Sequence, residues 1–178
     1  MTEKKDMYEK AKGEMRLSER ILAQLPGFRG YKEKELRRES DKLIRNHLYA
    51  KLMKARSDLK EVFQILSQQR RMEVLTDMDQ LVTKYDRVAE KINHASYGYA
   101  GFFNVIKVDE EKLDKMIEFD NNLIDEVQAV VDAASTFKKE ITKKGFDKAK
   151  DHIQKTNEAL QTLEDTFDQR GEVILGVN

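Results

Sequence analysis

The chain has 178 residues, of which 37% are charged and 39% are hydrophobic, and it contains a single proline. This composition favours long amphipathic helices over a sheet, and the length suits one domain with a sizeable core. The absence of cysteine excludes disulfides, thiol catalysis and cysteine-ligated metal centres. No apolar run approaches the ~18–20 residues of a membrane-spanning helix, and residues 1–12 are too charged for a signal peptide. We therefore expect a cytoplasmic protein.

Opposite charges balance over the whole chain but are separated along it. Residues 1–60 carry a net charge of +7, and residues 61–178 carry −7. Such an asymmetry can steer an acidic partner to one end of the molecule, or it can hold the two halves of one fold together. The structural interpretation carries more weight, because runs of charge are usually solvated helix faces.

Glycine and proline residues divide the chain into segments with helical periodicity. The predicted helices cover residues 2–25, 32–69, 70–95, 109–143 and 146–170. Pro26 ends the first, Asp109 is the expected N-cap of the fourth, and Gly171 is expected to end the fifth. These features predict an all-α fold, an elongated antiparallel bundle of four to five long helices in a single domain over residues 1–178.

Apolar residues three and four positions apart form coiled-coil-like seams along these helices. The seam that starts at Leu48 runs to Leu66, loses phase at residues 67–71 and resumes beyond them. The resumed seam consists of Leu75, Met78, Val82, Tyr85, Ala89 and Ile92. An unbroken helix over this region would be about 90 Å long, so we predict a break near Gln69.

Charged residues fall on two of the seams. Extending the heptads back from Leu48 places Arg45, Asp41 and Arg38 on the seam, and Asp120 interrupts the seam of the fourth helix. Because buried charges are costly unless paired, we predict that Asp120 accepts hydrogen bonds from Arg45 or His47. The expected role of this buried polar network is to specify the helix register. The alternative is a pocket for a small anion around Arg38, Arg45 and Asp120.

A basic run follows the first break. Residues 26–60 hold 11 lysines and arginines against 5 acidic residues. Such a run beside aromatic residues can bind RNA or another polyanion through phosphates and stacking. The candidate phosphate-binding residues are Arg29, Lys32, Lys34, Arg37, Arg38 and Arg45. Interleaved acids, such as Glu35 and Glu39, can neutralise part of this run through intrahelical pairs.

Two segments rich in aromatic residues and glycine, around residues 26–31 and 97–103, are the most unusual parts of the sequence. They can fold over the bundle end as a plug, or form an exposed apolar patch that docks a partner. We favour the plug, because apolar surface is more often buried than displayed. The candidate docking residues are Phe28, Tyr31, Tyr97, Tyr99, Phe102 and Phe103. The apolar tail over residues 173–177 can likewise pack against the bundle or pair with another chain.

The motifs of common catalytic and metal sites do not occur. The residues three before His47, His94 and His152 are Ile44, Lys91 and Ala149, so no Glu-x-x-His pair exists for a di-metal site. Only Glu90 and His94 make a same-face pair, and one pair cannot complete such a site. There is no His-Glu-x-x-His, phosphate-binding glycine loop or Gly-x-Ser-x-Gly. We expect neither enzymatic activity nor a metal or cofactor.

Two segments that contain the glycine-rich breaks resemble a family of uncharacterised prokaryotic helical proteins. They are PGFRGYKEKELRRESDKLIR (Pro26–Arg45) and YGYAGFFNVIKVDEEKLDKMIEFD (Tyr97–Asp120). The resemblance implies a helical protein of the prokaryotic cytoplasm. It implies no activity and assigns no catalytic or binding role to any residue.

The leading functional hypothesis is a non-enzymatic interaction or scaffold protein. Its surfaces would be the basic end near Pro26–Arg45 and an acidic face over residues 109–132, which hold nine acids against two lysines. The expected partner is another protein or a second copy of the chain. The alternatives are an RNA- or ribosome-associated factor that uses the 29–45 basic run, and a small-anion-binding protein.

Overall fold

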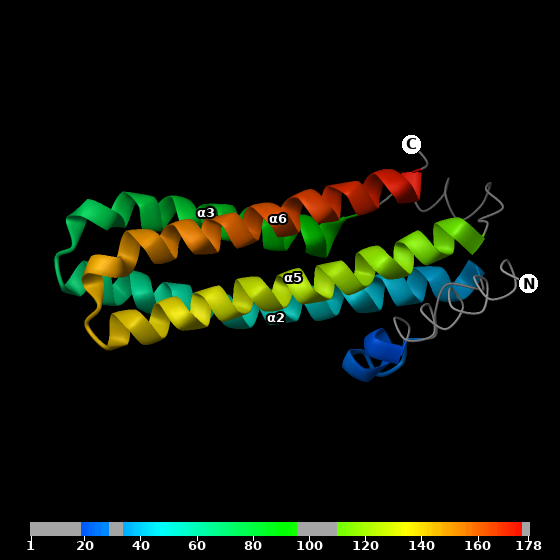
Figure 1. Ribbon diagram of the computed structural model, residues 1–178, viewed down its shortest axis with the longest axis horizontal. Helices are drawn as coiled ribbons and strands as arrows, with labels where there is room; N and C mark the ends of the chain where they lie inside the picture. Colours follow the sequence, from blue (N-terminus) through cyan, green and yellow to red (C-terminus); the bar gives the residue numbers. More distant parts are fainter. Residues whose placement is uncertain (1–18, 29–33, 96–109, 176–178) are drawn as a thin grey trace, which may run out of the picture.

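The computed structural model describes residues 19–28, 34–95 and 110–175, with side chains described over 19–28, 39–95 and 114–172. Four long helices dominate these residues (Figure 1). They are α2 (Lys34–Gln68), α3 (Met72–His94), α5 (Glu110–Thr142) and α6 (Ala149–Leu175), and the 3-10 turn η1 (Phe146–Lys148) precedes α6. No strand occurs in these ranges, and the elongated all-α bundle predicted from the sequence is confirmed.

The bundle consists of two antiparallel helix hairpins that pack side by side (Figure 1). One hairpin is α2–α3 and the other is α5–α6; α2 packs against α5, and α3 packs against α6. Residue numbers rise together across the α3–α6 contact, from Arg87–Glu164 to Lys91–Asp168, so these two helices run parallel. The same holds for α2 and α5. Each helix therefore has one antiparallel and one parallel neighbour.

The apolar seams form the core between the four helices. Six seam residues of α2, from Leu48 to Leu66, are at most 2% exposed, and the seams of α5 and α6 are buried in the same way. In α3 the predicted seam is partly wrong, because Val74, Leu81 and Val88 are buried, whereas Leu75 and Val82 are only partly buried. Adjacent apolar residues at 74–75 and 81–82 make the phase of the seam ambiguous in the sequence.

The turn between α2 and α3 confirms the predicted break near Gln69. Arg70 has a left-handed backbone with φ of 55°. The Arg71 N–H donates to the Leu66 carbonyl, and the Arg70 N–H donates to the Ser67 carbonyl, both at 3.0 Å. This pair of bonds is the Schellman motif, which satisfies the last carbonyls of a helix.

The turn after α5 repeats the same motif. Lys144 has φ of 66°, the Gly145 N–H donates to the Glu140 carbonyl at 3.0 Å, and the Lys144 N–H donates to the Ile141 carbonyl at 2.9 Å. Arg71 joins the two turns, because its guanidinium lies 3.1 Å from Asp147 and 5.8 Å from the centre of the Phe146 ring. We call this end of the bundle the tip and define it as residues 69–72 and 143–148.

The last helix differs from the sequence prediction, whereas the first ends where it was predicted to end. Helix α6 continues to Leu175, so Gly171 does not end it. Gly171 is buried beside the anchored Arg170, and the packing outweighs the cost of a helical glycine, about 1 kcal/mol. Of the first predicted helix, the structure describes residues 19–24, which end before Pro26. No described helix is long and apolar enough to cross a membrane.

Candidate functional site

A network of buried charges lies at the end of the bundle opposite the tip. Asp41 and Asp120 are fully buried, Arg170 is 1% exposed, and Arg45 is also buried. The Arg170 Nε donates to Asp120 Oδ1 at 2.7 Å, and its Nη1 lies 2.8 Å from Asp41 Oδ1. The Arg45 Nε donates to Asp41 Oδ2 at 2.9 Å. Two carboxylates and two guanidiniums from α2, α5 and α6 thus compensate one another.

Arg45 also connects this network to α3. Its Nη1 donates to the backbone carbonyl of Asn93 at 2.8 Å. Asn93 belongs to the last turn of α3, where carbonyls have no partner within the helix and where the helix dipole favours a cation. Arg45 therefore acts as a cap supplied by a neighbouring helix. All four long helices contribute to the network, three through side chains and α3 through its backbone.

The predicted partner of Asp120 is corrected by this geometry. The donor is Arg170 of the last helix rather than Arg45 or His47. The Nε2 of His47 is buried and has no hydrogen-bond partner among the described residues, and burial, followed by the charge of Lys51, lowers the pKa of His47. A signal for Arg170 does exist in the sequence, since continuing the α6 seam by three residues from Phe167 reaches it. The predicted helix over residues 146–170 includes this position, but the predicted seam ends at Phe167.

The network also corrects the role expected for Arg45 in binding phosphate. Arg45 is buried and ion-paired, so it does not belong to an exposed basic run. In the small-anion alternative, the carboxylates of Asp41 and Asp120 already occupy the places that an anion would take. Lys34, Arg37 and Arg38 lie on the first turns of α2, but their side chains are outside the described residues, as are Arg29 and Lys32 altogether.

Phe28 is the one predicted docking residue that the structure describes. Its ring is 3% exposed and joins the core cluster with Ile21 and Leu25, so Phe28 is buried, as the favoured interpretation expects, and is not available as a docking residue. This short segment lies on the bundle beside α5, because Arg20 pairs with Asp125 at 2.9 Å. The other aromatic candidates lie outside the described residues: Tyr31, Tyr97, Tyr99, Phe102 and Phe103.

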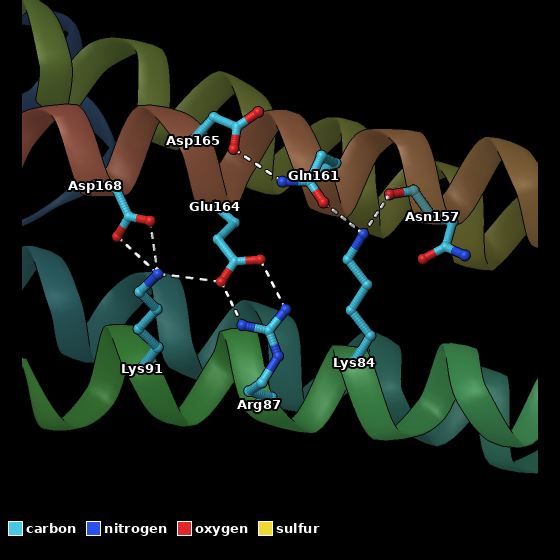
Figure 2. A network of polar contacts seen from close by, with 8 residues as sticks. All are labelled: Lys84, Arg87, Lys91, Asn157, Gln161, Glu164, Asp165 and Asp168. Atoms are coloured by element: carbon cyan, nitrogen blue, oxygen red, sulfur yellow. Dashed lines mark hydrogen bonds and ion pairs between the residues drawn. The ribbon is translucent and has the colours of Figure 1, made fainter.

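A second set of polar contacts joins α3 to α6 (Figure 2). Three basic side chains of α3 face three acceptors of α6, each pair separated by 77 residues in the sequence. The Lys84 Nζ donates to Gln161 at 2.9 Å, the Arg87 Nη2 donates to Glu164 at 2.8 Å, and the Lys91 Nζ donates to Asp168 at 2.7 Å. We call these six residues the α3–α6 ladder. Sequence analysis missed it, although both sets repeat at steps of three and four.

Glu164 is the central acceptor of the ladder. It is nearly buried, and it accepts from both nitrogens at the end of Arg87 and from Lys91 at 3.1 Å. These donors, Arg87 first, lower the pKa of Glu164 to about 2. Its carboxylate therefore stays ionised at any physiological pH and holds two cations of α3 beside α6. The ladder fixes which helix lies next to α3.

The pair singled out for metal binding is engaged internally. His94 Nε2 lies 3.0 Å from Glu90 Oε2, and Glu90 also accepts a hydrogen bond of 2.9 Å from the hydroxyl of Tyr49. Hydrogen bonds from Tyr49 and Asn93 lower the pKa of Glu90. Within the ranges where side chains are described, no three His, Asp or Glu residues are grouped so that they could hold a metal ion.

Comparison with known proteins gives no match: no family model, no curated protein and no solved structure is significantly similar to the chain. The resemblance of the Pro26–Arg45 and Tyr97–Asp120 segments thus stays a prediction. Functional inference depends on the geometry of the bundle itself.

Proposed function

We propose that this chain is a non-enzymatic interaction or scaffold protein. It binds another macromolecule through the bundle end from which the basic run and the residue 97–103 segment extend. The partner is a protein with an acidic and apolar surface, because the segments combine lysine and arginine with tyrosine and phenylalanine. Aromatic side chains with nearby cations are typical of protein-binding surfaces.

The observation that supports this proposal is the position of the buried charge network. Arg45 and Asp120 each lie about three turns inside the starts of α2 and α5, and Asn93 lies in the last turn of α3. The chain continues from these helix ends into both aromatic–glycine segments. The network joins all four helices in this half of the bundle, so it supplies a rigid base for the helix ends to which the segments are attached. Recognition residues in proteins are typically carried by connecting segments on such a scaffold.

The RNA alternative rests on fewer residues than the sequence suggested. With Arg45 assigned to the network, it depends on Arg29, Lys32, Lys34, Arg37 and Arg38. Phosphate contacts have a diagnostic property, because each neutralised phosphate releases counterions and makes the affinity fall with rising salt. An acidic protein partner that also contacts aromatic rings loses less affinity under the same change.

The proposal is tested by affinity capture with the full chain from its native cytoplasm, with quantitative identification of bound protein and RNA. One variant replaces Tyr97, Tyr99, Phe102 and Phe103 with serine, and a second carries Lys34→Glu, Arg37→Glu and Arg38→Glu. A matched control, Lys54→Glu with Lys60→Glu, alters exposed lysines in the middle of the same helix.

We expect a protein that the full chain and the control retain and that both variants lose by at least about tenfold, which corresponds to 1.4 kcal/mol. Binding must be repeated with the purified partner. Retention of the same protein by all four chains would contradict the proposal. RNA as the sole retained molecule, with steep salt dependence, would establish the alternative instead.

A further inference from the structure

The tip carries cations at two positions where helices usually carry glycine. Arg70 and Lys144 occupy the left-handed C′ positions of the two Schellman motifs, with φ of 55° and 66°. A non-glycine residue in this conformation costs roughly 1–2 kcal/mol. The helix dipole offsets part of this cost, because a cation is favourable at a helix C-terminus.

These cations interact with the helix dipoles but form no ion pair with the described part of the chain. Arg70, Lys143 and Lys144 are exposed, and among the described residues no carboxylate pairs with any of them. The neighbouring cations differ, since Arg71 pairs with Glu73 and Asp147, and Lys148 pairs with Glu140 at 2.8 Å. The tip therefore presents three exposed positive charges that form no ion pair within the described residues, on two turns that Arg71 and Asp147 hold together. Met72, 70% exposed, adds an apolar side chain to the same turn.

A complementary surface exists on the same chain. Exposed carboxylates recur every seven residues along the outer face of α6, and they are Asp151, Glu158, Asp165 and Glu172. Seven residues are about two helical turns, or about 10.5 Å, so these carboxylates form one acidic stripe. Glu158 and Asp165 accept hydrogen bonds only from the neutral amides of Gln154 and Gln161. Their negative charges are not neutralised by a described cation.

We infer that the tip of one copy docks on the acidic stripe of α6 in a second copy. The contact pairs Arg70, Lys143 and Lys144 with Glu158 and Asp165. Its two surfaces differ, so it is a heterologous contact, and its repetition produces a ring or an open chain rather than a two-fold symmetric dimer. It uses the bundle end opposite the proposed partner-binding segments. A copy engaged in this contact thus keeps those segments accessible, and self-assembly would make the scaffold multivalent.

The test is sedimentation and light scattering of the full chain over a wide concentration range. At low salt, we expect an average mass that rises above the 20.8 kDa monomer with concentration. At about 1 M salt, where the Debye length is about 3 Å, the mass returns to the monomer. A chain that stays monomeric at low salt throughout the range would overturn the inference.

Charge reversal identifies the surfaces. The tip variant carries Arg70→Glu, Lys143→Glu and Lys144→Glu, and the stripe variant carries Glu158→Lys and Asp165→Lys. Each alone is expected to stay monomeric, whereas an equimolar mixture associates, because the reversed tip of one now faces the reversed stripe of the other. Neutral variants, with glutamine at the same positions, keep the test valid if a reversed variant does not fold. Self-association that survives both reversals, or a mixture that stays monomeric, would contradict the assignment.

Discussion

The buried charge network and the α3–α6 ladder both join helices through ion pairs, but they differ in exposure. In the network Asp41, Asp120 and Arg170 have almost no contact with solvent. In the ladder the Arg87 side chain is 56% exposed, and only Glu164 is nearly buried. A buried charge that loses its partner keeps the full cost of desolvation, whereas an exposed charge recovers its hydration.

The comparison shows two different uses of charge within one bundle. The network makes the end of the bundle sensitive to the loss of any member, because each charge depends on the others. The ladder adds modest stability and selects the neighbour of α3. Both offset a cost of this arrangement, because parallel neighbours, α2 with α5 and α3 with α6, align their helix dipoles unfavourably. Apolar seams alone do not distinguish this arrangement from one in which the helix pairs are exchanged.

The largest effect is expected from Asp120→Asn, which leaves the Arg170 guanidinium buried with one carboxylate fewer. We expect a loss of about 3–5 kcal/mol in the free energy of unfolding. Urea denaturation followed by circular dichroism measures it. Asp125→Asn, on the exposed side of α5, is the matched control and should lose less than about 1 kcal/mol. If the two substitutions lowered the free energy of unfolding equally, buried and exposed ion pairs would not differ in their contribution to stability.

A smaller effect is expected from Arg45→Met, which keeps the aliphatic stem and removes the cap of α3. Loss of charged hydrogen bonds to Asp41 and Asn93 should cost about 2–3 kcal/mol. Because the last turn of α3 loses its cap, hydrogen exchange should accelerate most at the C-terminal end of α3. Uniform acceleration over the whole helix would show that Arg45 does not act as a local cap.

The ladder predicts a pH dependence of stability. The pKa of Glu164 falls from 4.5 to about 2 on folding, so its contribution is present above pH 4.5 and is lost as the pH falls towards 2. Because Arg87 is half exposed, we expect this contribution to be only about 1–2 kcal/mol. Glu164→Gln should remove it and flatten the stability profile between these pH values. Glu158→Gln is the control, and its profile should match that of the unmodified chain.

The smallest change in the free energy of unfolding is expected at the tip, where a substitution should stabilise the fold rather than destabilise it. Glycine adopts a left-handed backbone without strain, so Lys144→Gly should raise the free energy of unfolding by about 0.5–1 kcal/mol. Lys143→Gly, at the preceding position with no positive φ, should lower it by a similar amount. Thermal unfolding of the two variants side by side measures both changes. A loss of stability in Lys144→Gly would show that the lysine charge outweighs its backbone strain.

Much of the fold follows from local patterns in the sequence. The seams of α2, α5 and α6 depend on apolar residues at fixed spacing, and the break near Gln69 depends on the loss of that spacing. The same logic placed Asp41, Arg45 and Asp120 on buried faces, because a seam position is buried whichever residue occupies it. Local spacing, however, does not determine which helices are neighbours.

The parts that sequence reasoning missed are those that depend on contacts between helices. Arg170 pairs with Asp120 because α6 packs antiparallel against α5, and the spacing of residues within one helix does not determine that neighbour. The ladder required knowledge that α3 and α6 are parallel and adjacent. Phe28 is buried because the segment before it lies on the bundle, a contact between distant residues that its own sequence does not encode.

The central claim is that the buried charges act as one interdependent unit that joins the helices. A double-mutant cycle of Asp120→Asn and Arg170→Met, analysed by urea denaturation, tests this claim most directly. We predict that the double variant is little worse than either single variant, with a coupling energy of about 2–3 kcal/mol. Losses that simply add, within about 0.5 kcal/mol, would contradict it.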